Sequence, residues 1–504
     1  MRGLHVARAL AAALLALPVT TSLDVFVDPR ADEAAGDGSR AAPLATLPAA
    51  RDAVRALLAA EPHPADDIVV HVAPGTYRVR EALRLNASDC ARDGRRRVRW
   101  VADGKAPAVV SGATPVLGWA EAGGAGGNAA LLHAALPAAL AGRRPRHLFV
   151  GEARAYRTVD APNATVAGLA ASVGANVTAF GITTPSAAPL HWPNPAAVEL
   201  LHNAAFQQSR CAVRAVRPRG DGGADVVMAQ PCWSLGVATG QMAFPSAVLH
   251  IGGASAARLP PGAWHLTQDH TVVYHPRSAA ERTLLLNGGI EAAMPVATGL
   301  IDAVGVSALD IVGLQFERTA WEDASSDDGY LERYGGVRFL LCNSTKAKET
   351  GTCYASAGDA CAAGCCGAAG ALGGCALRMA EPAVHIAESR DVTITGCDFR
   401  QTGAWGLGLT RGTSYSTVSR NRFSDTSGGG VYLGNVNETR SNSSMPRPTA
   451  LSVTDNTVVN TGGEYQGSSG IHLFSAVDST IAHNHLHHIP YTAFVTFVWP
   501  VPRK

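Results

Sequence analysis

Charge is scarce in this sequence, since only 16% of its 504 residues are charged, against about 25% in an average soluble domain. Lysine and arginine number 42 and aspartate and glutamate 41, which argues against the clustered basic surface that nucleic-acid binding requires. Aromatic residues are few, at 6%, whereas glycine is frequent, at 53 residues. This composition favours short strands joined by many turns, and the 47% of hydrophobic residues exclude a disordered chain.

Long apolar runs are missing as well, because no stretch approaches the ~20 residues that cross a bilayer. The N-terminus has two arginines, an apolar run over residues 9–17 and small residues up to Ser22. This pattern predicts a secretory signal peptide at residues 1–22, with an N-terminal membrane anchor as the alternative. We expect a secreted, extracellular, monomeric glycoprotein with no membrane contact once the signal is removed. Six N-x-S/T sequons agree with export: Asn86, Asn163, Asn176, Asn343, Asn437 and Asn442.

Nucleotide-binding and serine-hydrolase chemistry have no support, because no GxGxxG, P-loop or GxSxG motif occurs in its structural context. We therefore expect no cofactor. His483, His485 and His487 alternate along a strand pattern, a spacing that is sterically possible for zinc. His483 occupies a turn beside Asn484, however, so local hydrogen bonding is the favoured interpretation and no metal site is expected.

Cysteines are concentrated in an alanine- and glycine-rich insert at residues 342–375. In an oxidising compartment such an insert needs cross-links, because it has little apolar material to bury, and we expect disulfide bonds there without choosing their pairing. A zinc site is the alternative, but no pair of CxxC knuckles is present. Cys397 lies within a strand pattern and is expected to be a buried free thiol. The insert contains Cys342, Cys353, Cys361, Cys365, Cys366 and Cys375.

A short pattern repeats from about residue 300 onwards. The apolar residues Ile394, Val418, Val453 and Ile481 recur at intervals of 24, 35 and 28 residues, and each unit continues through a glycine-bearing turn into a second strand. Repeats of this size with two or three short strands are typical of a parallel β-helix. A β-sandwich is the alternative, since it also uses short strands and glycine turns.

An asparagine recurs at one turn of this repeat, as Asn421, Asn456 and Asn484. If these residues stack, their amides can bond one another and satisfy backbone groups that would otherwise be unpaired. The recurring asparagine and the matched phase of the apolar positions favour the β-helix over the sandwich.

Several motifs resemble a known group of proteins. They are FVDP (residues 26–29), APGTY (73–77), FVGEARAYR (149–157), NTVVNTGGEYQGSSG (456–470) and HNHLHHIPYT (483–492). They are similar to motifs of right-handed parallel β-helix proteins of the pectin-lyase-like superfamily, most closely the glycoside hydrolase family 141 type, over most of residues 24–499. The resemblance implies an all-β, right-handed parallel β-helix solenoid with an N-terminal cap and an irregular β-rich insertion.

Changes of pattern along the sequence suggest how the chain is organised. We expect a signal peptide (1–22), a capping block with the first coils (23–119), a β-rich insertion (120–300) and repeat coils (301–504). The cysteine-rich insert departs from the group's pattern. Residues 494–499 lack the glycines that the group carries after this point, so we also expect a truncated C-terminal end.

Candidate catalytic residues follow from the phase of the repeat. Two positions beyond the apolar residue that ends each repeated motif, such as Phe399 or Phe423, the successive coils carry Arg318, Gln401, Asp425, Asn460 and His488, of which only Asp425 is a carboxylate. The next coil has a longer turn that carries Glu464 outward. With coils stacked about 4.8 Å apart, we expect Asp425 and Glu464 to converge on one face together with outward-facing Tyr432 and His472.

Two carboxylates are what glycoside hydrolysis requires, because one protonates the leaving oxygen and the other acts as nucleophile or activates water. We predict that Asp425 and Glu464 form this pair, with either able to be the acid. The alternatives are that Asp425 caps a turn and that Glu464 is a solvated loop charge. The predicted substrate-binding residues are Tyr432, His472 and Tyr465 for sugar hydroxyls and Trp405 or Trp321 for stacking. A second source of carboxylates is the cluster Glu322, Asp323, Asp327 and Asp328.

Three functions remain open at this point. The first is a secreted glycoside hydrolase that cleaves cell-wall polysaccharide, with a fucosidase or xylan-type activity by resemblance. The second is a polysaccharide lyase, which the single outward aspartate and the absence of lysine in the coils disfavour, although Arg400, Arg411 and Arg422 keep it open. The third is a non-catalytic surface protein that binds glycans. In each case the expected partner is a polysaccharide or oligosaccharide.

Overall fold

The computed structural model describes most of the chain after residue 22. The described ranges are 23–33, 35–60, 67–91, 96–121, 130–157, 176–192, 194–204, 207–242, 259–334, 336–341, 375–439 and 445–496. The predicted signal peptide, nearly all of the cysteine-rich insert and the sequons at Asn163, Asn343 and Asn442 lie outside these ranges. No helix in the described part of the chain is long and apolar enough to span a membrane.

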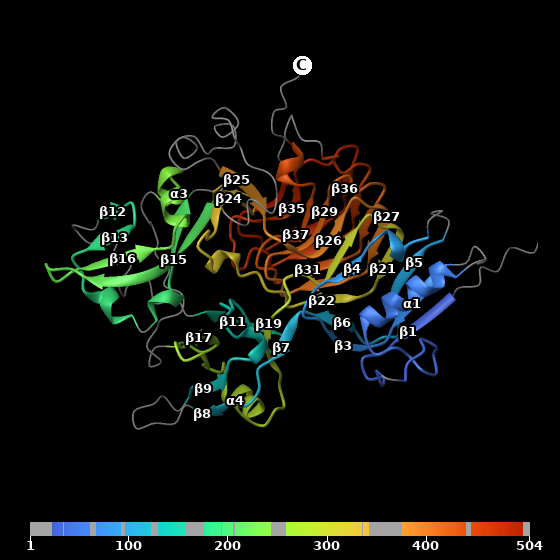
Figure 1. Ribbon diagram of the computed structural model, residues 1–504, viewed down its shortest axis with the longest axis horizontal. Coiled ribbons are helices and arrows are strands. Elements are labelled where there is room, and N and C mark those ends of the chain that lie inside the picture. Colours follow the sequence, from blue (N-terminus) through green and yellow to red (C-terminus); the bar gives the residue numbers. More distant parts are fainter. Residues whose placement is uncertain are drawn as a thin grey trace, which may run out of the picture.

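Three long parallel sheets wind around one core (Figure 1). The first sheet contains β1 (Leu23–Val27), β2 (Ile68–Val72), β5 (Val98–Ala102), β21 (Ser307–Val312), β27 (Arg390–Thr395), β30 (Thr417–Ser419), β33 (Ser452–Thr454) and β36 (Thr480–Ala482). The second contains β3 (Gly75–Arg78), β6 (Ala108–Ser111), β22 (Gln315–Glu317), β28 (Asp398–Arg400), β31 (Arg422–Ser424), β34 (Thr457–Val459) and β37 (His485–His487). The third contains β4 (Leu83–Leu85), β20 (Ile301–Val304), β26 (Pro382–Ala387), β29 (Trp405–Thr410), β32 (Val431–Leu433), β35 (Ser469–Leu473) and β38 (Thr492–Thr496).

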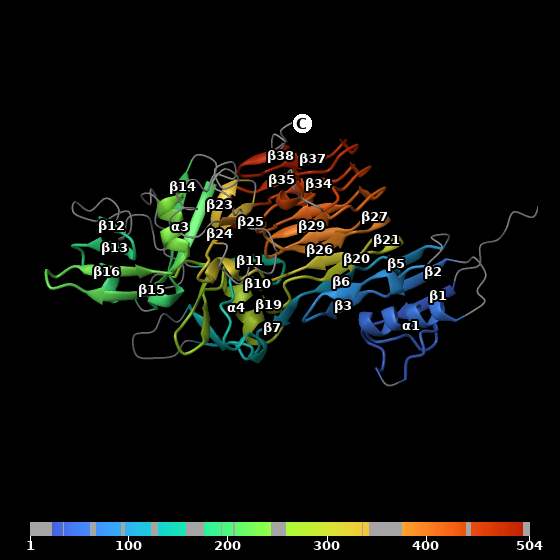
Figure 2. The same cartoon turned by 45° about the horizontal axis from the view of Figure 1, so that its top comes forward.

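From β2 onwards each coil contributes one strand to each sheet, so the chain forms the predicted parallel β-helix, whose strands stack in a ladder in Figure 2. The apolar positions of the repeat stack directly, with Ile394 beside Val418 and Val453 beside Ile481. Ile394, Val418 and Val453 are buried, which confirms the predicted inward phase. Burial of this continuous apolar column stabilises every coil against its neighbours.

The predicted asparagine ladder is also present. Nδ2 of Asn421 donates to Oδ1 of Asn456 at 3.0 Å, and Nδ2 of Asn456 donates to Oδ1 of Asn484 at 2.9 Å. The same amides donate to the carbonyl oxygens of Ile394 and Val418. The ladder therefore satisfies backbone groups at the turn from the first sheet to the second.

One helix covers the N-terminal end of the solenoid. Helix α1 (Leu47–Ala59) begins after Thr46, whose hydroxyl accepts from the amide of Ala49 at 3.3 Å. It buries Leu47, Ala50 and Val54 in the solenoid core. The cap satisfies the first turn of the helix and the buried face closes the end of the apolar column.

Two insertions leave the solenoid between the second and third sheets. The first runs from β6 to β20 and forms a mixed eight-stranded sheet and an antiparallel five-stranded sheet. The former contains β7 (Ala113–Pro115), β8 (Ala120–Glu121), β9 (Leu132–Ala135), β10 (Leu148–Val150), β11 (Ala153–Arg157), β17 (Ala263–Leu266), β18 (Thr271–Tyr274) and β19 (Ala292–Pro295). The latter contains β12 (Asn176–Thr178), β13 (Gly181–Thr184), β14 (Glu199–Ala204), β15 (Gln207–Pro218) and β16 (Ala224–Met228).

The second insertion, between β22 and β26, contains a three-stranded sheet of β23 (Leu331–Tyr334), β24 (Val337–Leu341) and β25 (Cys375–Met379). Shorter helical elements are α3 (Cys232–Ala238), α4 (Ala279–Leu286), η1 (Ala87–Asp89), η2 (Ala138–Leu140), η3 (Ala188–His191), η4 (Pro195–Ala197), η6 (Asp323–Ser325) and η7 (Val436–Thr439). One disulfide, Cys211–Cys232, lies in the first insertion. Cys90 and Cys397 are buried free thiols, as predicted for Cys397.

Candidate active site

Asp425 and Glu464 lie in the turns that lead from the second sheet to the third, after β31 and β34 respectively. The amide of Glu464 donates to the carbonyl oxygen of Ser427 at 3.0 Å, so the two turns run side by side. The Asp425 side chain is 37% exposed and the Glu464 side chain 12%. The two predicted carboxylates thus come from neighbouring coils, and the first insertion packs against both.

Glu464 is held by four cationic or polar side chains of this insertion. Its Oε1 lies 2.5 Å from Nη2 of Arg146, 2.9 Å from Nη2 of Arg157 and 3.1 Å from Nη1 of Arg210. Its Oε2 lies 2.7 Å from Nε2 of His147. Burial opposes ionisation, but the positive charge of Arg146 and its neighbours outweighs it and holds the pKa of Glu464 well below its usual value.

A second buried carboxylate, Glu199 on β14, shares the same arginines. Its Oε1 lies 2.5 Å from Nη1 of Arg146 and 3.3 Å from Nη1 of Arg157, and its Oε2 lies 3.6 Å from Nη1 of Arg210. Burial again opposes ionisation and the arginines outweigh it, so the pKa of Glu199 is lowered. Three arginines thus face two ionised carboxylates, Glu199 and Glu464, which leaves one positive charge in excess. No sequence pattern pointed to Glu199.

Hydrogen bonds connect Glu464 with Asp425. Arg154 donates through Nε to Oδ1 of Asp425 at 2.9 Å and through Nη1 to Oγ of Ser427 at 3.0 Å. Ser427 Oγ lies 3.1 Å from Nε2 of His147, the nitrogen that also faces Glu464. Burial lowers the pKa of His147 to about 4, so the imidazole is neutral at pH 7 and a proton on Nε2 is donated to the Glu464 carboxylate.

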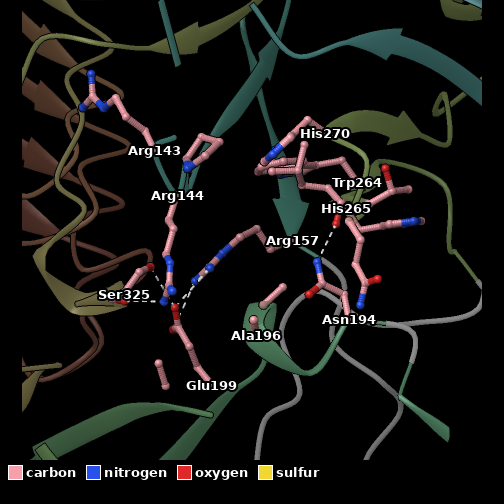
Figure 3. A pocket seen from close by; sticks show the side chains of 16 residues that line it. Arg143, Arg144, Arg157, Asn194, Ala196, Glu199, Trp264, His265, His270 and Ser325 are labelled. Carbon is pink, nitrogen blue, oxygen red and sulfur yellow. Dashed lines mark hydrogen bonds and ion pairs between the residues drawn. The ribbon is translucent and has the colours of Figure 1, made fainter. Parts of the chain in front are cut away.

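Two adjoining cavities open beside this cluster. The smaller, of about 170 Å³, is lined by Arg146, His147, Arg154, Arg157, Arg210 and Glu464 among others. The larger, of about 370 Å³, lies on the other side of Arg157, which lines both. Figure 3 shows the larger cavity, with Arg144, Arg157 and Glu199 on one side and Trp264 and His265 on the other.

A third cavity, of about 540 Å³, lies along the outward face of the third sheet. His385 on β26 is 3.0 Å from Oδ1 of Asp302 through Nδ1 and 2.9 Å from Oγ1 of Thr410 through Nε2. Hydrogen bonding by His385 lowers the pKa of Asp302. Glu381 lines the same cavity and accepts from Nε1 of Trp321 at 2.6 Å. No motif in the sequence points to Asp302, His385 or Glu381, although Asp302 and His385 occupy paired, outward positions of their strands.

The predicted sugar-stacking role does not fit the positions of the two tryptophans. Trp321 is 2% exposed and Trp405 is fully buried. Trp321 packs edge-on against Tyr465 at 4.8 Å, and Trp405 packs edge-on against Tyr432 at 5.4 Å. The insertions cover the outward face of the third sheet here, so neither ring presents a face to a ligand.

The remaining predicted residues are also placed by the structure. Tyr465 and His472 are buried, and neither lines any of the three cavities described above, whereas Tyr432 lines the cavity on the third sheet. In the acidic cluster, Glu322 pairs with Arg143, and Asp323 and Asp327 pair with other arginines. The described residues contain no group of three side chains arranged to hold a metal ion.

Comparisons with known proteins agree with this fold. A family model described as "Right handed beta helix region" matches residues 339–497. A solved structure described as "Glycoside hydrolase" superposes with a TM-score of 0.71 at 17% identity, covering 95% of this chain and 80% of that one. The chain has a right-handed β-helix fold. No curated protein matches the sequence.

Two further solved structures match less well. "The complex structure of XylC with xylose" has a TM-score of 0.46 at 10% identity and covers 93% of this chain and 59% of that one. The tailspike protein gp49 from Pseudomonas phage LKA1 has a TM-score of 0.19 at 9% identity, covering 87% and 51%.

Proposed function

We propose that this β-helix protein is a secreted glycoside hydrolase that cleaves a cell-wall polysaccharide, with the fucosidase or xylan-type activity implied by its resemblance to family 141. The observation that carries the proposal is Glu464, an ionised carboxylate held by three arginines and a histidine at the wall of a cavity. Asp425 on the preceding coil supplies the second carboxylate that hydrolysis requires. The structure described as a glycoside hydrolase supports the fold on which this chemistry is placed.

The environments of the two carboxylates suggest different roles. Glu464 stays ionised because its arginine partners keep its pKa well below the usual value, so it has no proton to donate and is assigned the role of the nucleophile. The role of the acid that protonates the leaving oxygen then falls to Asp425, the other member of the pair. His147 and the arginines position Glu464 and hold its charge.

The cavity on the third sheet is the alternative place for the same reaction. It is larger, and it brings the ionised Asp302 together with Glu381, His385 and Tyr432. These residues lie on or beside regular strands of the solenoid, which hold side chains more rigidly than turns do.

Mass spectrometry of products from a panel of plant and algal polysaccharides tests the proposal. Products that have gained one water indicate hydrolysis, unsaturated products would replace the proposal with a lyase, and no products from folded protein would favour a glycan-binding function. Asp425→Asn should lower kcat by at least about 100-fold.

Asp455→Asn is the matched control, because Asp455 has a similar left-handed backbone (φ +58° against +50°) at a different turn of the coil. Full activity of Asp425→Asn together with loss in Asp302→Asn would move the active site to the third sheet.

A further inference from the structure

The larger cavity beside Glu464 has an arginine-rich wall. Arg143, Arg144 and Arg157 line it, and Glu199 is the only carboxylate among the described residues that line it. Trp264, His265 and His270 form part of the opposite wall (Figure 3). Whether such a wall attracts an anion depends on how many of these charges are already neutralised within the protein.

One arginine of this wall, Arg144, forms no ion pair within the described ranges. Nη2 of Arg143 lies 2.9 Å from Oε1 of Glu322, so its charge is compensated. Glu199 is shared by Arg146, Arg157 and Arg210 and is more than neutralised. Arg144 donates from Nη1 to the carbonyl oxygen of Ser325 at 3.1 Å and forms no ion pair with any carboxylate in the described ranges.

The surroundings of Arg144 disfavour its charge on balance. Partial burial, and then the positive charge of Arg214, lower the pKa of Arg144, and the negative charges of Asp327 and Glu199 offset this only in part. Arg214 itself pairs with Asp327. A ligand anion at Arg144 would therefore replace lost hydration and supply the direct ion pair that Arg144 does not form within the described ranges.

His265 provides a second, independent observation on the opposite wall. The residue is 8% exposed, it lines the cavity, and its Nδ1 is buried without a hydrogen-bond partner among the residues that the structure describes. Burial lowers the pKa of His265, so the ring is neutral at pH 7 and can donate or accept one hydrogen bond. An unsatisfied buried polar atom in a cavity wall costs free energy that a bound polar group recovers.

We propose that this cavity is a subsite for an acidic substituent of the glycan, a carboxylate or a sulfate group. Arg144 supplies the charge, Arg157 adds a second guanidinium, and His265 bonds the sugar or its acidic group. Because Arg157 also lines the smaller cavity at Glu464, the acidic sugar unit binds next to the proposed site of cleavage. Only this last placement rests on the proposed function, since binding of the acidic unit does not require hydrolysis.

Isothermal titration of the intact protein with matched oligosaccharides tests the subsite. The probes are a glucuronic-acid-bearing xylo-oligosaccharide, its carboxyl-reduced neutral counterpart and a sulfated oligosaccharide. The wild type should bind the better of the two acidic probes at least about tenfold more tightly than the neutral one. Which acidic probe binds better distinguishes a carboxylate from a sulfate.

Arg144→Gln should abolish this preference without changing affinity for the neutral probe, and His265→Phe should weaken binding while keeping an aromatic ring in place. Arg217→Gln is the control, because Arg217 is exposed on β15 and does not line the cavity. Equal affinity of the wild type for acidic and neutral probes would overturn the proposal. So would an equal loss in Arg144→Gln and Arg217→Gln, because it would show only a long-range effect of net charge.

The two proposals fail separately. A protein that prefers acidic probes but releases no products keeps the subsite and loses the hydrolase function. A protein that hydrolyses glycans without any preference for acidic ones keeps the function and loses the subsite.

Discussion

Nε2 of His147 lies 2.7 Å from Oε2 of Glu464, although the two residues are 317 positions apart in the chain. The contact joins the first insertion to the solenoid, and Arg146, the residue before His147, joins the same carboxylate to Glu199. The insertion that leaves the coils near residue 112 thus folds back and binds the turn that contains Glu464. Glu464 therefore contributes both to the stability of the fold and to the proposed activity.

Glu464→Gln should destabilise the fold as well as reduce activity. The variant leaves the buried guanidiniums of Arg146 and Arg210 with one carboxylate instead of two. Removing one member of a buried ionic group costs about 3–5 kcal/mol. Asp425→Asn removes a carboxylate that is 37% exposed and should cost less than about 1 kcal/mol. Urea unfolding of both variants measures the difference, and equal costs would contradict the buried cluster.

His147→Gln should lose less stability than the wild type as the pH is lowered from 6.5 to 4. The folded-state pKa of His147 is about 4 against 6.5 for an unperturbed imidazole. Between these values the unfolded chain binds a proton that the folded chain does not, so stability falls as the pH falls. The wild type should lose about 3 kcal/mol more than the variant between pH 6.5 and 4. Thermal unfolding at several pH values measures this, and parallel curves would show that His147 is accessible to protons.

Glu332→Gln should weaken the loss of stability that occurs as the pH rises. Glu332 is buried, and burial raises its pKa to about 7 from 4.5 although Tyr330 and two backbone amides donate to it. Between pH 4.5 and 7 the Glu332 carboxyl is therefore protonated in the folded chain but ionised in the unfolded chain. The free energy of unfolding falls as the pH rises through this interval. The variant should lose about 3 kcal/mol less than the wild type over this interval. Identical pH curves for the two proteins would contradict a buried, protonated Glu332.

Asn456→Ala should destabilise the solenoid more than Asn484→Ala does. Asn456 is buried, accepts from the backbone amide and the side chain of Asn421 and donates to Val418 and Asn484. Each buried group left without a partner costs about 1–3 kcal/mol. Asn484 is only partly buried, so water compensates there. Denaturant midpoints rank the two variants, and the reverse order would contradict a ladder that depends on burial.

Ile394→Asp should prevent the coil from forming, because it places an unpaired charge in the apolar column and costs several kcal/mol. Thr417→Asp is its outward-facing control, since Thr417 lies between Thr393 and Ser452 on the first sheet and is partly exposed. Circular dichroism and solubility report the outcome. A soluble, cooperatively unfolding Ile394→Asp protein would show that the inward phase is wrong.

The repeat itself was predictable from the sequence because its interactions are periodic. Five residues lie two positions beyond the inward apolar residue of the second-sheet strand in their coil. All five adopt left-handed backbone angles, with φ between +50° and +56°. They are Arg318, Gln401, Asp425, Asn460 and His488. One conformation recurs in every coil, so a regular spacing in the sequence locates it.

The roles of Trp321 and Trp405 were not predictable in the same way. A repeat pattern distinguishes inward from outward positions, but it does not tell whether an outward position meets solvent or an insertion. Here the insertions cover the third sheet, and Trp321 packs against Tyr465 while Trp405 packs against Tyr432. Tyr432 nevertheless lines the cavity on the third sheet.

The sequence by itself determined the solenoid, its inward apolar column and its asparagine ladder, because each depends on contacts between equivalent positions of neighbouring coils. Only the tertiary structure decided that Glu464 faces Arg146, Arg157 and Arg210, that Glu199 shares these arginines and that Arg144 forms no ion pair with a carboxylate in the described ranges. These contacts join an insertion to a distant turn and follow no period. Their electrostatics depend on burial and on distances of 2.5–3.6 Å, which arise only when the chain has folded.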